Sequence, residues 1–88
     1  MAVLLVTYDL NKEIKRPKIV EAIKKYSWAR LSESSYAIAT TETPQTVYNK
    51  LTEFLDGDDQ IYIINLRKPY WGFGPKDVND WLDSNLPG

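Results

Sequence analysis

The segment of residues 2–9 constrains the fold more than any other part of the chain. It reads Ala-Val-Leu-Leu-Val-Thr-Tyr-Asp, so apolar and β-branched residues follow one another with almost no polar alternation. A continuous run of this kind is typical of a central strand that is covered on both faces. The two faces of that strand are Leu4, Val6 and Tyr8 on one side and Val3, Leu5 and Thr7 on the other.

Helical and strand-like segments then alternate in the order βαββαβ. Two βαβ units with right-handed crossovers give a four-stranded antiparallel sheet with both helices on one face, which is an α+β, ferredoxin-like fold. The proline at position 17 and the Thr43-Pro44 pair suit helix starts. The expected elements after the first strand are a helix over residues 17–26, strands over 28–31 and 35–40, a helix from 44 to 55 and a strand over 60–66.

Two helices can bury only one face of such a sheet. The second apolar face predicts a partner subunit or the C-terminal segment folded over it, and we favour a homodimer. At 88 residues the chain forms one domain, with residues 1–67 as the ferredoxin-like unit. Residues 68–88 form an aromatic loop and a short helix, whose apolar residues Val78, Trp81 and Leu82 pack on the domain or on a partner.

Composition removes several kinds of chemistry. The chain has no cysteine and no histidine, which excludes disulfides, thiolate nucleophiles, imidazole bases and the usual zinc ligands. The apolar run at the N-terminus is too short to span a bilayer, so we expect a cytoplasmic protein without membrane contact. Residues 1–30 contain seven basic and three acidic residues, a net charge of +4, whereas residues 31–88 contain four basic and nine acidic ones, a net charge of −5.

Asp9 is the first candidate for catalysis and for metal binding, because it lies where a rigid strand meets a loop. One carboxylate holds Mg²⁺ poorly, but a two-fold dimer would supply a second. Such a pair could hold an ion that activates water or polarises a phosphodiester. The alternative is that Asp9 only caps or orients the following loop.

Basic side chains follow Asp9 closely and are candidates for nucleic-acid binding, since a phosphate backbone held by them would pass near the carboxylate. A solvated helix entrance explains the same charges. The candidates are Lys12, Lys15, Arg16 and Lys18.

Two further motifs have simpler structural explanations. The stretch 56–59, Asp-Gly-Asp-Asp, lacks the alternating ligands and closing glutamate of a calcium loop and is interpreted as a tight turn. The aromatic loop lies outside the strands, which separates it from the base-stacking motif of RNA-recognition domains. We interpret this segment as a docking loop first and a binding surface second, in which Tyr70, Trp71 and Phe73 would bind a partner.

Several segments together resemble the small CRISPR-associated Cas-two (Cas2) proteins and the related virulence-associated protein D ribonucleases. They are the strand that ends Tyr8-Asp9, the basic pair Lys15-Arg16, the helix closing at Tyr26 and the strand beginning Ser35-Tyr36. The resemblance covers about residues 2–66. It implies a homodimer in which the aspartate at the end of the first strand faces its mate, with a metal role for Asp9.

Members of that family have been described as metal-dependent nucleases and as non-catalytic scaffolds that hold nucleic acid beside a partner. The family also adds a fifth strand that pairs with the other subunit, where this chain has the aromatic loop and a short acidic helix. Two hypotheses follow. The first is a Mg²⁺-dependent endonuclease or endoribonuclease acting on RNA or DNA, and the second is a dimeric scaffold, adaptor or regulatory protein without catalysis.

Overall fold

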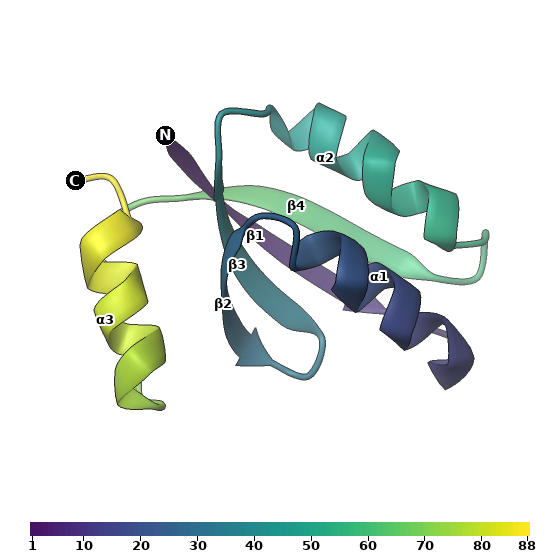
Figure 1. Cartoon of the computed structure of the whole chain (residues 1–88), viewed down its shortest axis with the longest axis horizontal. Coiled ribbons are helices and arrows are strands. Elements are labelled where there is room, and N and C mark those ends of the chain that lie inside the picture. Colours follow the sequence, from purple (N-terminus) through teal and green to yellow (C-terminus); the bar gives the residue numbers. More distant parts are fainter.

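The computed structural model describes residues 1–88 and confirms the ferredoxin-like α+β fold. Four antiparallel strands form one sheet in the order β2-β3-β1-β4 (Figure 1). The main elements are β1 (Ala2–Asp9), α1 (Arg16–Ile23), β2 (Ser27–Ser32), β3 (Ser35–Thr40), α2 (Pro44–Leu51), β4 (Gln60–Leu66) and α3 (Lys76–Asn85). Two short 3₁₀ helices, Glu13–Lys15 and Thr52–Phe54, flank α1 and α2.

The helix boundaries follow local chemistry. Thr43 caps α2, because its side-chain oxygen accepts a hydrogen bond from the backbone N–H of Thr46. The first helix ends at Ile23, three residues before the end expected from the sequence. The backbone N–H of Tyr26 donates to the carbonyl of Ile23, and this hydrogen bond closes a tight turn after the helix. Strand β2 begins at the next residue, Ser27.

The main core lies between the sheet and the pair α1 and α2. Alternate residues of β1 point into it, as the sequence predicted, and α1 and α2 lie side by side over that face (Figure 1). Full burial of a side chain of this size contributes about 1.5–3 kcal/mol, so this cluster is the main source of stability. Its buried members are Leu4, Val6, Tyr8, Ile19, Ile23, Tyr36, Ile38, Val47 and Leu51.

A second, smaller core lies on the opposite face of the sheet, where α3 packs. Leu82 and Leu86 of α3 are buried against Val3, Ala37 and Ala39, and the alanines on β3 let the helix approach closely. The indole N–H of the neighbouring Trp81 reaches back to the Ser27 hydroxyl of β2 at 3.2 Å. The C-terminal segment therefore covers the part of this face that lies over β2 and β3.

The rest of the second face stays uncovered. Strand pairing aligns Leu5 with Ile64 and Thr7 with Tyr62, so these residues share that face beside Asp9. Tyr62 and Ile64 are exposed, at 64% and 49% of their surface. The part of the sheet formed by β1 and β4 thus presents apolar side chains to solvent.

No helix in the structure combines the length and hydropathy that a bilayer crossing requires.

Candidate functional site

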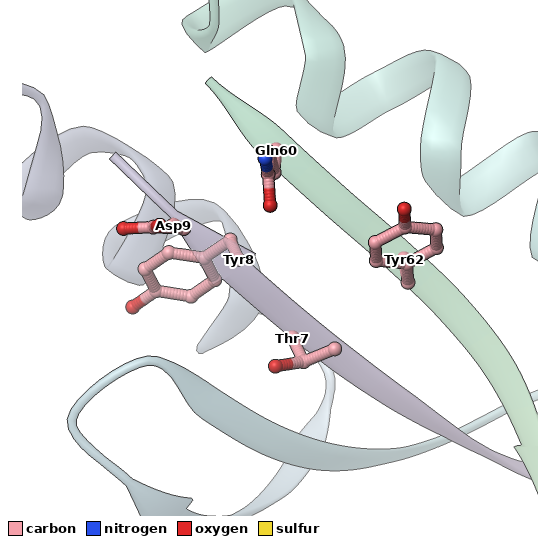
Figure 2. Close-up of a pocket in the computed structure, with 5 residues that line it drawn as sticks. All are labelled: Thr7, Tyr8, Asp9, Gln60 and Tyr62. Carbon is pink, nitrogen blue, oxygen red and sulfur yellow. The ribbon is translucent and has the colours of Figure 1, made fainter. Parts of the chain in front are cut away.

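Asp9 is the last residue of β1, and it is exposed on the uncovered part of the second sheet face. It lines a shallow hollow of about 100 Å³ together with Thr7, Tyr8, Gln60 and Tyr62 (Figure 2). Gln60 is its pairing partner on β4. The Asp9 carboxylate makes no ion pair or side-chain hydrogen bond within the chain, so its oxygens are free to bind a ligand.

The strand end that carries Asp9 is held firmly from the other face. Tyr8 is buried, and its hydroxyl donates to the carbonyl of Glu33 at 3.2 Å. Arg16 also donates to that carbonyl, at 2.5 Å, and its guanidinium lies 5.6 Å from the centre of the Tyr8 ring. Burial raises the pKa of Tyr8, so the phenol stays neutral and serves to anchor the strand.

A second anchor joins the loop after β1 to the turn before β4. The Asp59 carboxylate, fully buried at its side chain, accepts from the backbone N–H groups of Asn11 and Asp56 at 2.8 and 2.9 Å. Its other partner is the Lys15 ammonium at 2.8 Å, which also pairs with Asp56. These hydrogen bonds lower the pKa of Asp59 to about 2, and the one from Lys15 has the largest effect. The 56–59 stretch is therefore the turn expected from the sequence, tied down by a lysine.

The four basic candidates are in two different situations. Lys15 is held between the two aspartates, and Arg16 forms a bidentate pair with Glu13 at 2.6 and 3.0 Å. Lys12 and Lys18 are exposed and form no ion pair. The structure thus leaves two of the four positive charges without a partner inside the chain, and Lys18 lines a different hollow from Asp9, together with Glu21 and Phe54. An ammonium or guanidinium that is already paired contributes less to phosphate binding than a free one.

Metal binding within one chain is limited by the number of ligands. No group of three or more acidic side chains in the structure is arranged so that it could hold a metal ion. Asp9 is the only carboxylate that lines its hollow. A magnesium site at Asp9 therefore depends on oxygen ligands from outside the chain, such as a second copy, waters or a substrate phosphate.

The aromatic loop 67–75 is fixed at one end and open at the other. The Tyr70 hydroxyl contacts the Asp83 carboxylate at 2.7 Å, which ties the loop to α3. Trp71 and Phe73 are fully exposed. Of the three aromatic residues proposed to bind a partner, two are thus free to do so, and Tyr70 holds the loop in place.

Comparison with known proteins gives the family. A sequence model of the family described as CRISPR associated protein Cas2 matches residues 1–72, which include all four strands and both helices of the main core. The chain belongs to the CRISPR-associated Cas2 family. This confirms the resemblance drawn from the Tyr8-Asp9 strand end, and it leaves α3 outside the matched residues.

Two solved structures share the fold of this Cas2-family chain. A hypothetical protein, TT1823, from Thermus thermophilus matches with a TM-score of 0.67 and 22% identity, over 84% of this chain and 94% of its own. Streptococcus pyogenes Cas2 matches with a TM-score of 0.57 and 21% identity, over 93% of each chain. At these identities the similarity shows the fold.

Sequence reasoning missed part of the surroundings of Asp9. Gln60 and Tyr62 line the same hollow, and the pairing of the first and last strands of a ferredoxin-like sheet would have placed them there. It also missed the contact of Lys24 with Trp28, 4.7 Å from the ammonium to the ring centre. The signal for that contact was the turn between them, which brings the end of a helix over the strand that follows.

Proposed function

We propose that this Cas2-family chain acts as a homodimer in which the two Asp9 carboxylates together hold a Mg²⁺ ion and cleave a phosphodiester of RNA or DNA in the cytoplasm. The observation that carries the proposal is the position of Asp9. It is an exposed, unpaired carboxylate on the part of the sheet that α3 leaves uncovered. Tyr62 and Ile64 on that same surface are the apolar groups that a second copy would bury.

A two-fold dimer solves the shortage of ligands. In an isologous interface the same patch is used by both copies, so each Asp9 near the axis is matched by its mate. The Asp9 oxygens carry negative charge and have no internal partner, which fits a hard cation that prefers oxygen ligands. When bound, Mg²⁺ would lower the pKa of a water molecule and offset the charge that develops on the phosphate.

Residues that hold the end of β1 or carry free positive charge have supporting roles. Tyr8 and its partner Arg16 keep the end of β1 in place, so that the carboxylate is presented from a rigid strand. The exposed Lys12, three residues after Asp9, supplies positive charge for a phosphate beside the cleaved bond, and Lys18 on α1 supplies it farther along the nucleic acid. Their contribution is to affinity and position and carries no base specificity.

The test is cleavage of labelled single- and double-stranded RNA and DNA by the intact protein and by Asp9→Asn, with Mg²⁺ or with EDTA. We expect cleavage of at least one substrate that needs both Mg²⁺ and the carboxylate. Asp58→Asn is the matched control, because Asp58 is an exposed aspartate in the turn 56–59, outside the hollow. Equal cleavage by the intact protein and Asp9→Asn, or no cleavage of any substrate, overturns the proposal.

A second candidate function is a dimeric scaffold or adaptor without catalysis. The observation that favours it is the aromatic loop, where Trp71 and Phe73 expose 102% and 105% of their reference surface. Large aromatic side chains of this kind are common anchors in protein interfaces. Removing the whole tail would also expose the core under α3, so the better variant is Trp71→Ser with Phe73→Ser. A partner that the intact chain captures and this double variant captures equally well counts against the loop as the binding surface.

A further inference from the structure

A strip of basic and aromatic side chains lies along the outer strand β2, on the face of the sheet opposite to Asp9. Its members are Lys24, Trp28 and Arg30, and we call it the Trp28 strip. β2 is an edge strand, next to β3 only (Figure 1). Trp28 pairs with Ile38 and Arg30 with Tyr36, two residues of the main core, so both side chains lie on the helix side of the sheet.

Trp28 is only partly used by the core. The indole and the Tyr36 ring make an edge-to-face contact, with ring centres 5.9 Å apart and the rings at 62°. The Trp28 side chain nevertheless keeps 38% of its surface exposed. The exposed part is an aromatic surface fixed in place by a strand and a neighbouring ring.

Two positively charged side chains belong to the strip. The Lys24 ammonium lies over the indole ring, 4.7 Å from its centre. Arg30, two residues along β2, donates a hydrogen bond from its Nε to the carbonyl of Ser32 at 3.3 Å. Neither residue takes part in any of the five ion pairs of the chain. Arg16, farther along the same side, is paired with Glu13 and is not counted in the strip.

We propose that the Trp28 strip is a binding surface for single-stranded nucleic acid. Proteins that bind single strands combine an aromatic side chain, on which a base stacks, with cations that follow the backbone. Trp28 supplies the aromatic ring, and Lys24, which lies over that ring, and Arg30 supply charges that take part in no ion pair. Side chains at alternate positions of a strand share one face and lie about 7 Å apart, so Trp28 and Arg30 can contact neighbouring parts of one nucleic-acid strand.

The link between the Trp28 strip and Asp9 rests on the proposed function. The strip adds to that function the direction in which the nucleic acid runs across the sheet. Through β3, Trp28 is level with Leu4 of β1, and Arg30 is level with Val6. The line from Trp28 to Arg30 thus runs toward the end of β1 that carries Asp9. A nucleic-acid strand bound along this line would leave the strip at the end of the sheet that carries Asp9 on its opposite face.

The experiment measures binding of a fluorescein-labelled single-stranded RNA and DNA by anisotropy, in EDTA so that no cleavage occurs. Trp28→Leu keeps an apolar side chain on Tyr36 but removes the stacking surface, and it should weaken binding at least about fivefold. Trp28→Phe retains a ring and should recover much of that loss. Tyr48→Leu, on the exposed side of α2, is the matched control and should bind like the intact protein.

The charges are tested by salt dependence. Lys24→Gln with Arg30→Gln should reduce the slope of log K against log salt by about 1.4, since each phosphate contact on a single strand contributes about 0.7. The control is Lys25→Gln with Lys76→Gln, which removes two charges away from the strip. Far-ultraviolet circular dichroism checks that each variant is folded.

The outcomes separate this inference from the proposed function. If folded Trp28→Leu binds the oligonucleotide as tightly as the intact protein, the proposal that the Trp28 strip binds single-stranded nucleic acid is wrong. The same holds if the double charge variant has the same salt dependence as its control. Either result would be expected if the surface bound a protein instead. Asp9→Asn should bind the single strand as the intact protein does. If Asp9→Asn cleaves normally while Trp28→Leu binds weakly, the proposed function fails and the strip stands.

Discussion

Replacing Leu82 by alanine should reveal whether the C-terminal helix is part of the fold. Leu82 is 8% exposed and packs on the face of the sheet formed by Val3, Ala37 and Ala39. The change removes three carbon atoms and leaves a cavity over small side chains that cannot fill it. Substitutions of this type cost about 2–4 kcal/mol. A domain of this length has roughly 4–13 kcal/mol in total, so the loss is a large share.

The assay is thermal and urea unfolding followed by circular dichroism. At about 4–8 °C for each kcal/mol, the midpoint of Leu82→Ala should fall by roughly 10–25 °C. Leu31→Ala is the matched control, because Leu31 is 41% exposed on β2 and should cost well under half as much. Equal destabilisation by the two variants would refute the packing of α3 on the sheet, and with it the division of the second face.

Two other predictions concern the dimer and acid stability. Ile64→Lys should convert a dimer seen by analytical ultracentrifugation into a monomer, because it places a charge on the uncovered apolar surface; a persisting dimer would exclude that surface as the interface. The pKa of Asp59 falls from 3.8 to about 2 on folding, so its stabilising effect is complete above about pH 4 and lost as the pH falls toward 2. Asp59→Asn should therefore show a shallower loss of stability over that range, and an unchanged acid profile would contradict the role of the Lys15 contact.

The fold follows from the sequence because its strongest signals are local. The continuous apolar run of β1 predicts a central strand, and the two amphipathic helices predict which face they cover. The alternation of Leu4, Val6 and Tyr8 with Val3 is confirmed by the two cores. What the sequence left open was the second face, because both a partner and the tail offer apolar residues of the right kind. The structure places α3 on half of it.

The candidate site is harder to predict because charge pairing is set by tertiary contacts. Lys15 and Arg16 look like free cations in the sequence, yet Lys15 meets Asp56 and Asp59 from a turn over forty residues away. Trp28 looks like an ordinary strand residue, yet it is 38% exposed and has the Lys24 ammonium over its ring, which only the tertiary structure shows. The role of Asp9 depends on a second copy, and no pattern within one chain defines that geometry.

The central claim is that two Asp9 carboxylates share one metal ion, and its most direct test is the stoichiometry of metal binding. Isothermal titration of the intact dimer with Mn²⁺, as a stand-in for Mg²⁺, should give one ion for every two chains, and Asp9→Asn should abolish the heat of binding. The Asp58→Asn control should titrate as the intact protein does. One ion per chain, or unchanged binding in Asp9→Asn, would contradict the account.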